Sequence, residues 1–209
     1  ELPSSNEIAS EVEFNSNTFD ILFTGNIGEA QDFPAIIDAV ECLRNENVRW
    51  LIVGGGRMND WLKDEIINRS LESQIILLGE FPIERMTSFY NHSQALLVSL
   101  KRDYFLSLVI PGKVQSYLMS GLPILGMVQG EAEQVIKKSG CGYTCESGDG
   151  VALAAIVKKM ILTSDADRSF MGTMGRNFAI QEFDRKMLLK KLESWMFEYA
   201  SNYKSKSNE

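Results

Sequence analysis

Residues 19–40 read FDILFTGNIGEAQDFPAIIDAV, and this stretch decides the fold. An apolar run, Phe19 to Thr24, predicts a buried strand, and a glycine turn follows it. Asp32 then supplies a helix cap and Pro34 a first-turn proline. The helix predicted after them places its apolar residues on one face: Ile36, Ile37, Val40 and Leu43. The stretch is therefore one strand–turn–helix unit.

The same alternation continues to about residue 183, with strands predicted at Phe19–Thr24, Arg49–Val53, Ile75–Leu78, Ala95–Leu100, Pro123–Met127 and Gly142–Cys145. Several of these runs are apolar throughout, which indicates helices on both faces of a parallel sheet. The sequence predicts an α/β fold: a Rossmann-like, doubly wound parallel sheet of about six strands with helices on both faces, plus C-terminal helices.

Further helices are predicted around Trp61–Ile67, Met86–Tyr90, Val114–Met119, Ala132–Lys138, Asp165–Ala179 and Asp184–Asn202. Asp149 is predicted to cap one more helix, which begins directly after it. We divide the chain into a connector (1–17), a Rossmann-like core domain (18–183) and a C-terminal helix with a polar, frayed tail from Ser201 (184–209). The last helix carries an apolar stripe of Leu188, Leu192, Trp195 and Tyr199. We favour docking of this stripe on the same domain over packing on an absent neighbour.

Composition is that of a folded protein, with 44% hydrophobic and 23% charged residues. A net charge of -7 argues against a nucleic-acid partner, because such binding relies on neutralising phosphates. No apolar run approaches the roughly 20 residues of a membrane span, and no secretion signal begins the chain. We therefore expect a cytoplasmic protein. The residues before Phe19 look like a connector left from a longer chain.

Cysteine and histidine point to no catalytic centre. Cys42, Cys141 and Cys145 match neither a redox pair nor a zinc knuckle, so we interpret them as structural thiols. His92 is the single histidine, and no nucleophile motif accompanies it, which favours a packing or capping role.

Glycine-rich turns follow three successive strands, at Gly25–Gly28, Gly54–Gly56 and Gly79–Pro82. Ligands of doubly wound sheets bind beyond the carboxyl ends of the strands, and glycine lets backbone amides approach an anion. Each turn alone is commonly just a tight connection, but the coincidence of three predicts a phosphate site. No turn has the spacing of a dinucleotide fingerprint or of a P-loop.

The fourth edge adds positive charge. Lys101 and Arg102 follow the fourth strand, and Lys113 lies in the first turn of a helix predicted to begin at Pro111. We expect a cation and a helix dipole to converge there on one anion.

Five ordered segments then resemble the retaining family 4 glycosyltransferases of the GT-B fold, in the branch that builds capsule, O-antigen and exopolysaccharide. They are FTGNIGEAQ, LIVGGG, LGEFPIERMTSFY, IPGKVQSYLMSGLPIL and GEAEQVIKKSGCGY, and together they span most of residues 19–183. The resemblance implies that the chain is the C-terminal, donor-binding half of such an enzyme. The acceptor half would precede it.

The resemblance also implies the contacts of a nucleotide sugar. The donor diphosphate would lie near Gly25 to Gly28 and the base near Phe81, and Gly54 and Gly55 are also among the expected donor-binding residues. The ribose would contact the helix at Pro111–Ser120, including Gln115 and Ser116, and the sugar hydroxyls would contact Gly130 and Glu131.

The sequence departs from the family pattern at charged positions. Asn26 and Gln31 stand where many members carry an Arg and a Lys, and the paired glutamates of the family fall at Leu108 and Ser116. Lys113 is our candidate for stabilising the diphosphate, since leaving-group stabilisation needs positioned donors rather than one particular side chain.

Two functions stay open. The first is sugar transfer with retention from a nucleotide sugar, a UDP-sugar foremost, to a saccharide or lipid-linked acceptor, without a metal and with peripheral membrane contact through the absent domain. The second is a degenerate module that binds a nucleotide or a partner chain without turnover. An epimerase of the same architecture is disfavoured, because His92 follows no glycine turn.

Overall fold

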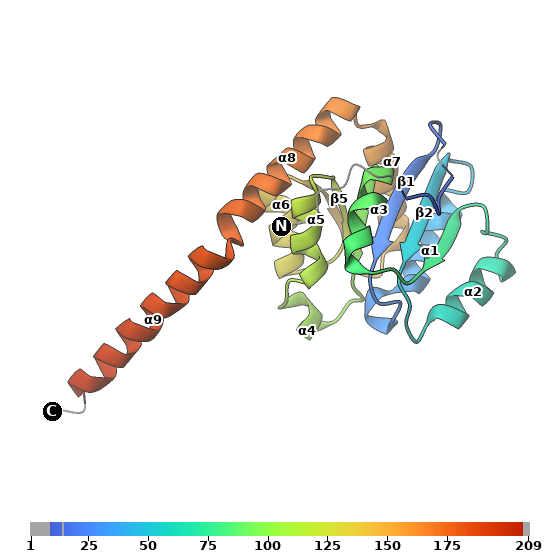
Figure 1. Ribbon diagram of the computed structural model, residues 1–209. Helices are drawn as coiled ribbons and strands as arrows, with labels where there is room; N and C mark the ends of the chain where they lie inside the picture. The colour runs from blue at the N-terminus through green and yellow to red at the C-terminus, as the bar shows by residue number, and fades with distance from the viewer. Residues whose placement is uncertain (1–8, 14, 207–209) are drawn as a thin grey trace.

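The computed structural model describes residues 9–13 and 15–206 of the chain. Six parallel strands form one sheet in the order β3-β2-β1-β4-β5-β6, with helices on both faces (Figure 1). The strands are β1 Phe19–Thr24, β2 Val48–Val53, β3 Ile75–Gly79, β4 Ala95–Ser99, β5 Ile124–Met127 and β6 Gly142–Cys145. This confirms the predicted fold class, and each predicted strand lies within one residue of its observed ends.

The α-helices are α1 Phe33–Cys42, α2 Asn59–Asn68, α3 Met86–His92, α4 Tyr104–Ser107, α5 Gly112–Ser120, α6 Glu131–Ser139, α7 Gly150–Leu162, α8 Asp165–Glu182 and α9 Arg185–Lys206. Two short 3-10 helices, η1 Glu29–Gln31 and η2 Ile83–Arg85, and the single turn of α4 have no counterpart in our prediction. Such segments are too short to show an apolar period.

Alternate residues of each strand feed two separate cores. Ile21 and Phe23 of β1 point to the face covered by α1, α2 and α7, whereas Leu22 points to the face covered by α3, α5, α6 and α8. This is the period of two expected of a strand. It explains why the strand sequences are apolar throughout, because both faces of the sheet are buried.

Local sequence signals set several helix boundaries. Asp149 accepts a hydrogen bond from the backbone N–H of Ala152 at 2.8 Å, which confirms the predicted cap of α7. Asp32 occupies the position before α1 in a left-handed backbone conformation. Gly121 and Gly140 end α5 and α6 with positive φ, as glycine does at many helix ends.

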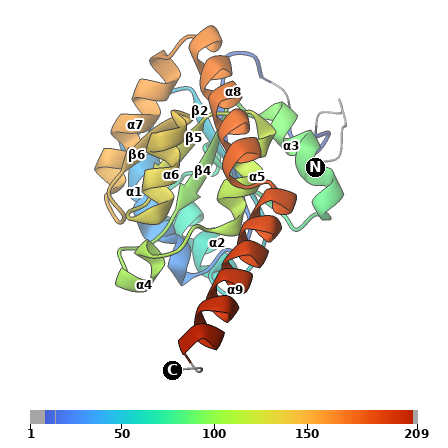
Figure 2. The ribbon, with the colours of Figure 1, turned by 90° about the vertical axis from the view of Figure 1, so that its left-hand side faces the viewer.

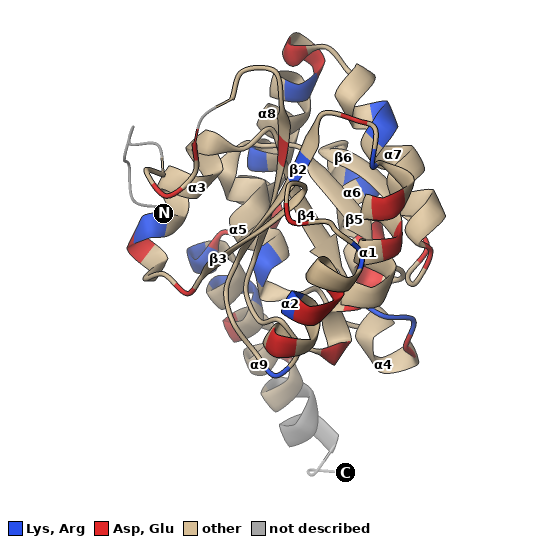
Figure 3. Cartoon of the chain, turned by 90° about the vertical axis from the view of Figure 1, so that its right-hand side faces the viewer, with Lys and Arg blue, Asp and Glu red and all other residues tan. Residues whose placement is uncertain are grey.

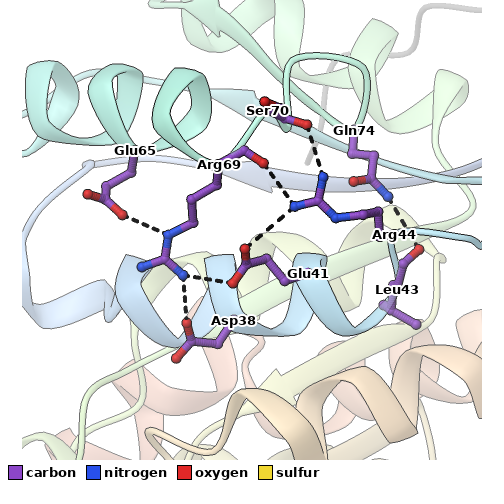
Figure 4. A network of polar contacts seen from close by, with 8 residues as sticks. All are labelled: Asp38, Glu41, Leu43, Arg44, Glu65, Arg69, Ser70 and Gln74. Carbon is purple, nitrogen blue, oxygen red and sulfur yellow. Dashed lines mark hydrogen bonds and ion pairs between the residues drawn. The ribbon is translucent and has the colours of Figure 1, made fainter.

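A polar network joins α1 to the end of α2 (Figure 4). The Arg69 guanidinium lies 2.8–3.1 Å from three carboxylates, and Arg44 donates to two backbone carbonyls just after α2. The three acidic partners of Arg69 are Asp38, Glu41 and Glu65. Charged residues of α1 are all acidic and those of α7 all basic, whereas α2 carries both signs (Figure 3).

His92 belongs to a buried charge cluster at the amino ends of the strands. The Arg49 guanidinium binds both carboxylate oxygens of Asp20 at 2.7 and 2.8 Å, and His92 Nε2 lies 3.1 Å from Asp20 Oδ2. Burial lowers the pKa of His92, which favours the neutral imidazole. This cluster lies at the edge of the sheet opposite to the glycine turns, so His92 packs as the sequence predicts.

The described part of the predicted connector is attached to the domain. Ala9 and Val12 are buried in the core beside α3, and the Ala9 N–H donates to the Ser88 carbonyl at 3.2 Å. Glu11 also pairs with Arg85 at 2.9 Å. Residues 1–8 lie outside the described part of the chain, and the assignment of 1–17 as a connector stays a prediction.

The C-terminal helices behave differently from one another. Gly172 of α8 lies so close to the Gly121 carbonyl that an added Cβ would stand 1.7 Å from its oxygen, which lets α8 pack on α5. In contrast, α9 extends away from the sheet and its layers (Figures 1 and 2).

The favoured docking of the α9 stripe on this domain is therefore wrong. All of its residues are exposed: Leu188 42%, Leu192 50%, Trp195 56% and Tyr199 76%. Periodicity in the sequence showed that an apolar face exists, but the direction in which α9 leaves α8 decides what that face meets. The helix runs to Lys206, beyond the predicted start of the tail, and 207–209 lie outside the described residues. Within the described part of the chain, no helix is both long and apolar enough to cross a bilayer.

Candidate functional site

A cleft of about 680 Å³ lies beyond the carboxyl ends of β1, β2 and β3. It adjoins the point between β1 and β4 where the strand order reverses, which is where open parallel sheets bind ligands. Seven predicted site residues line it: Gly25, Asn26, Gly54, Gly55, Phe81, Lys113 and Ser116. The three glycine turns therefore meet at one site, as the sequence predicts.

Backbone contacts hold the three turns together as the floor of the cleft. The Gly25 N–H donates to the Val53 carbonyl at 2.9 Å, and the Gly54 N–H donates to the Gly79 carbonyl at 2.7 Å. A Cβ on Gly54 would lie 1.9 Å from the Gly25 carbonyl oxygen, and φ of Gly54 is 141°. Only glycine fits there, so the floor is bare backbone.

The first turn has two backbone N–H groups without a partner in the part of the chain described, and only one of them, that of Asn26, belongs to a residue that lines the cleft. The N–H groups of Asn26 and Gly28 take part in no hydrogen bond within the described residues. The Asn26 side-chain amide faces Gln31 at 3.5 Å, a long hydrogen bond. Uncharged donors thus occupy the turn in which the resembled family carries an Arg and a Lys.

Lys113 brings the positive charge of the cleft from a different element, the first turn of α5. Its Nζ is buried, lies 3.7 Å from the centroid of the Phe23 ring, and has no hydrogen-bond partner within the described residues. A Cβ built on Gly25 would be 3.4 Å from this Nζ, so the amine lies directly behind the first glycine turn. Burial lowers the pKa of Lys113 from 10.5 to about 7.

Buried aromatic hydroxyls support this wall. The Tyr117 hydroxyl lies 2.8 Å from the Thr24 backbone nitrogen, whose N–H donates to it, and 3.1 Å from Thr24 Oγ1. Tyr90 packs edge-on against Tyr117 with ring centroids 6.1 Å apart. These contacts connect the end of β1 to α3 and α5, and they hold the helix that carries Lys113.

The opposite end of the cleft is formed by the turn after β3. Phe81 packs edge-on against Phe89 at 4.9 Å, with the Arg85 guanidinium 5.6 Å from the Phe81 ring centroid. Ile83, 73% exposed, stands at the rim. This end offers an aromatic and apolar surface, suited to a planar ring.

Six cleft residues were not among our predicted site residues: Thr24, Val53, Glu80, Ile83, Met86 and Tyr90. Thr24 and Val53 end β1 and β2, and Glu80 lies inside a turn that the sequence had singled out, so their position after a strand was a usable signal. Met86 and Tyr90 come from α3, whose orientation across the sheet is not readable from the sequence.

The remaining predicted residues do not line this cleft: Gly28, Gln31, Pro111, Gln115, Gly130 and Glu131. Gln115 lies in an adjoining depression shared through Ser116, together with residues of α8 and α9. Gly130 packs on the Ser107 carbonyl, where an added Cβ would be 2.0 Å from the oxygen, and Glu131 begins α6. Leu108 is 55% exposed and outside the cleft.

Other candidate chemistry is absent from the described part of the chain. No three His, Cys, Asp or Glu side chains gather there in a way that could hold a metal ion. The three cysteines are free, and burial raises the pKa of Cys141 to about 11 and of Cys145 to about 12, which keeps these thiols protonated and unreactive.

The doubly wound parallel sheet is the fold of solved glycosyltransferase structures. The sequence pattern of the glycosyl transferases group 1 family matches residues 4–177. The chain belongs to this family. The probable glycosyltransferase WbjE of Pseudomonas aeruginosa is 27% identical over 174 residues, which are 81% of this chain and 42% of WbjE.

Solved structures with the same fold include HepE of Anabaena with UDP and glucose, at a TM-score of 0.72 and 16% identity over 87% of this chain and 48% of HepE. The pneumococcal O-GlcNAc transferase GtfA with UDP and GlcNAc gives a TM-score of 0.69 and 19% identity over 93% of this chain and 38% of GtfA. The C-terminal domain of LpcC, a group 1 glycosyl transferase of Francisella tularensis, gives 0.64 and 14% over 80% of this chain and 87% of that domain. This chain spans less than half the length of WbjE and HepE.

Proposed function

We propose that this chain is the donor-binding half of a retaining glycosyltransferase that transfers a sugar from a nucleotide sugar, a UDP-sugar foremost, to a saccharide or lipid-linked acceptor in bacterial surface polysaccharide synthesis. Membership of the glycosyl transferases group 1 family supports sugar transfer. HepE and GtfA were solved with UDP, which supports a uridine donor. Retention and the polysaccharide role rest on the sequence resemblance to family 4.

The single observation that carries this proposal is the Lys113 amine. A buried amine without an acceptor is costly, because it loses hydration and receives no hydrogen bond in exchange. This cost is understandable if an anion completes the site during function. The amine lies behind Gly25, and the next residue of the same turn, Asn26, has an unused N–H and lines the cleft, so a diphosphate on this turn would receive both donors.

These donors suit the chemistry of sugar transfer. As the bond between the anomeric carbon and the diphosphate oxygen breaks, negative charge grows on the departing diphosphate. Donors already held in place stabilise this charge without reorganising, which is the main source of catalysis in such steps. Lys113 in its charged form and the amides of the first turn would fill this role, and we expect no metal requirement.

For the whole protein we propose a second domain that binds the acceptor. The chain spans 42% of WbjE, which leaves room for such a domain in a protein of similar length. The exposed stripe on α9 is the surface that we assign to contact with it, because an apolar face left in water is costly. A cytoplasmic protein with peripheral membrane contact through that domain is part of the proposal.

The alternative, a degenerate module that binds a nucleotide or a partner without turnover, is favoured by one observation. Neither position aligned with the family's glutamates carries a carboxylate, and Leu108 lies outside the cleft. A longer protein that includes this chain separates the two readings: an active enzyme releases UDP from a UDP-sugar in the presence of acceptor, whereas a degenerate module binds UDP and releases none.

The first test of the proposal is a calorimetric titration of this chain with UDP, GDP and UDP-N-acetylglucosamine. We expect saturable UDP binding that Lys113→Ala weakens at least about tenfold, since hydrogen bonds to charged groups contribute about 1.5–3 kcal/mol. Ser116→Glu should tighten binding if it restores the family carboxylate. Lys101→Ala, which removes an exposed lysine outside the cleft, is the matched control.

Absence of nucleotide binding at millimolar concentration would count against the donor site, as would UDP binding of equal strength in the wild type and in Lys113→Ala. Tighter binding of GDP than of UDP would retain the donor site and replace the uridine donor with a guanosine one.

A further inference from the structure

Glu80 is the one carboxylate among the residues that line the described cleft. It follows β3 directly, and its side chain reaches back over the neighbouring strand. A Cβ built on Gly55 would lie 2.7 Å from Glu80 Oε1 and 3.0 Å from Cδ, so the carboxylate rests against the backbone at the end of β2. A glycine at position 55 is what leaves room for it.

The Glu80 carboxylate has no structural task in the part of the chain described. No hydrogen bond or ion pair holds it there, in contrast to Asp20 or to the acidic partners of Arg69, each of which pairs with a guanidinium. The residue is exposed, and nothing in the fold requires a negative charge beside the cleft. The carboxylate oxygens are therefore available to accept hydrogen bonds from a ligand.

The order of the strands indicates which part of a nucleotide reaches Glu80. Neighbouring strands lie about 4.8 Å apart. The anion-binding groups, Gly25 and Lys113, gather at the end of β1, and the apolar surface of Phe81 follows β3. The end of β2 lies between them. In a nucleoside diphosphate bound along this edge, the ribose lies between the phosphates and the base, and thus falls beside the carboxylate over Gly55.

Charge supports the same placement. A carboxylate beside the diphosphate would repel it, so Glu80 is badly suited to the phosphate end of the cleft. Two vicinal hydroxyls are well suited, because a carboxylate has two acceptor oxygens and each hydroxyl has a proton to donate. Dinucleotide-binding folds use an acidic side chain for the ribose in the same way.

We propose that Glu80 binds the ribose hydroxyls of the nucleotide donor and thereby substitutes, from the turn after β3, for the carboxylate that Ser116 lacks on α5. This rests on the proposed function, since it assigns a role within the same donor site. Ser116 lines the same cleft but offers one neutral oxygen, where a carboxylate offers two charged acceptor oxygens. The cleft thus selects ribonucleotides over deoxyribonucleotides.

The test compares UDP, 2′-deoxy-UDP and inorganic pyrophosphate as ligands of the wild type, Glu80→Ala and Glu80→Gln by calorimetry. We expect the wild type to bind UDP at least about tenfold more tightly than 2′-deoxy-UDP, and Glu80→Ala to remove most of that preference. Glu80→Gln should fall between them, since an amide has one acceptor oxygen and no charge. Pyrophosphate, which has no ribose, should bind Glu80→Ala at least as tightly as the wild type.

Glu84→Ala is the matched control, because Glu84 is an exposed acidic residue in the same turn region that does not line the cleft. The proposal is overturned if Glu80→Ala keeps the wild-type preference for UDP over 2′-deoxy-UDP. If Lys113→Ala weakens UDP binding while Glu80→Ala keeps the preference for UDP over 2′-deoxy-UDP, the donor site is supported and only the role of Glu80 is refuted. If the wild type binds none of the three ligands, the donor site itself fails and this inference fails with it.

Discussion

Replacing Lys113 with Met should make the folded chain more stable while it weakens UDP binding. Met keeps the length of the side chain and removes the buried charge. Lowering the pKa of Lys113 from 10.5 to about 7 corresponds to about 5 kcal/mol of free energy by which the fold disfavours the ammonium. The function of the site therefore comes at a cost to the unliganded protein.

The expected gain in stability is smaller than this limit. At pH 7 about half of the folded molecules can carry a neutral amine, and a Met side chain gives up the contact of the ammonium with the Phe23 ring, worth about 1 kcal/mol. We expect Lys113→Met to raise the free energy of unfolding by about 2–3 kcal/mol near pH 7.

The assay is urea unfolding of the wild type and Lys113→Met at pH 6.5, 8.5 and 10. Between pH 7 and 10.5 the unfolded chain holds a proton on Lys113 that the folded chain has released, so wild-type stability gains with rising pH across this window. The advantage of the variant should be largest at pH 6.5 and small at pH 10. The control Lys101→Met, at an exposed position, should change stability by less than about 0.5 kcal/mol.

A Lys113→Met variant that is less stable than the wild type at pH 6.5 would refute the reasoning, because it would mean that the amine has a favourable partner in the folded state. An advantage that is equal at pH 6.5 and pH 10 would refute it as well, since a gain without pH dependence would come from packing and not from the charge.

Three further perturbations test the packing of the glycine turns, the buried ion pair and the charge of Lys113. Gly54→Ala should destabilise the chain by about 3 kcal/mol or more, because the Cβ of the alanine would lie 1.9 Å from the Gly25 carbonyl oxygen. The loss is measured as a lower melting temperature, and an unchanged melting temperature would contradict the close packing of the turns. Arg49→Met should lower the free energy of unfolding, measured in urea, by about 3–5 kcal/mol, because it leaves the Asp20 carboxylate buried without its guanidinium partner. A decrease below about 1 kcal/mol would show that the ion pair is dispensable. UDP affinity should rise as the pH falls from 8.5 to 6.5, because bound diphosphate favours the charged form of Lys113; above pH 7 the rise is up to about tenfold per pH unit. The same pH series on Lys113→Met measures the effect of the titration of UDP itself. Identical pH dependence in the wild type and the variant would disprove the linkage to Lys113.

In the proposed donor site, Lys113 supplies the positive charge from a different element than the resembled family does. The first glycine turn lacks the charges of that family, and Asn26 and Gln31 contact each other there instead. The cation comes from α5 and reaches the back of the same turn, next to Gly25. If Glu80 likewise takes the place of the family carboxylate that is absent at position 116, both changes move a charge to another element and keep it near the part of the ligand that it binds.

Much of the fold was predictable from the sequence, because burial repeats with a period that the sequence displays. Apolar runs such as Phe19–Thr24 mark a strand buried on both faces wherever it lies in the sheet, and glycines after β1, β2 and β3 mark where the chain must turn sharply. The carboxyl ends of parallel strands share one edge. For that reason the sequence by itself determined that Gly25, Gly54 and Phe81 lie at one cleft.

Tertiary structure alone decided what the side chains of different elements do to one another. The burial of the Lys113 amine behind Gly25, the Glu80 carboxylate over Gly55 and the exposure of Trp195 on α9 all depend on how helices and turns are oriented across the sheet. Such orientations are set by the packing of many residues far apart in the chain, and no local period encodes them. The sequence determined the scaffold and the edge that carries the candidate site, and packing determined which charges reach that edge.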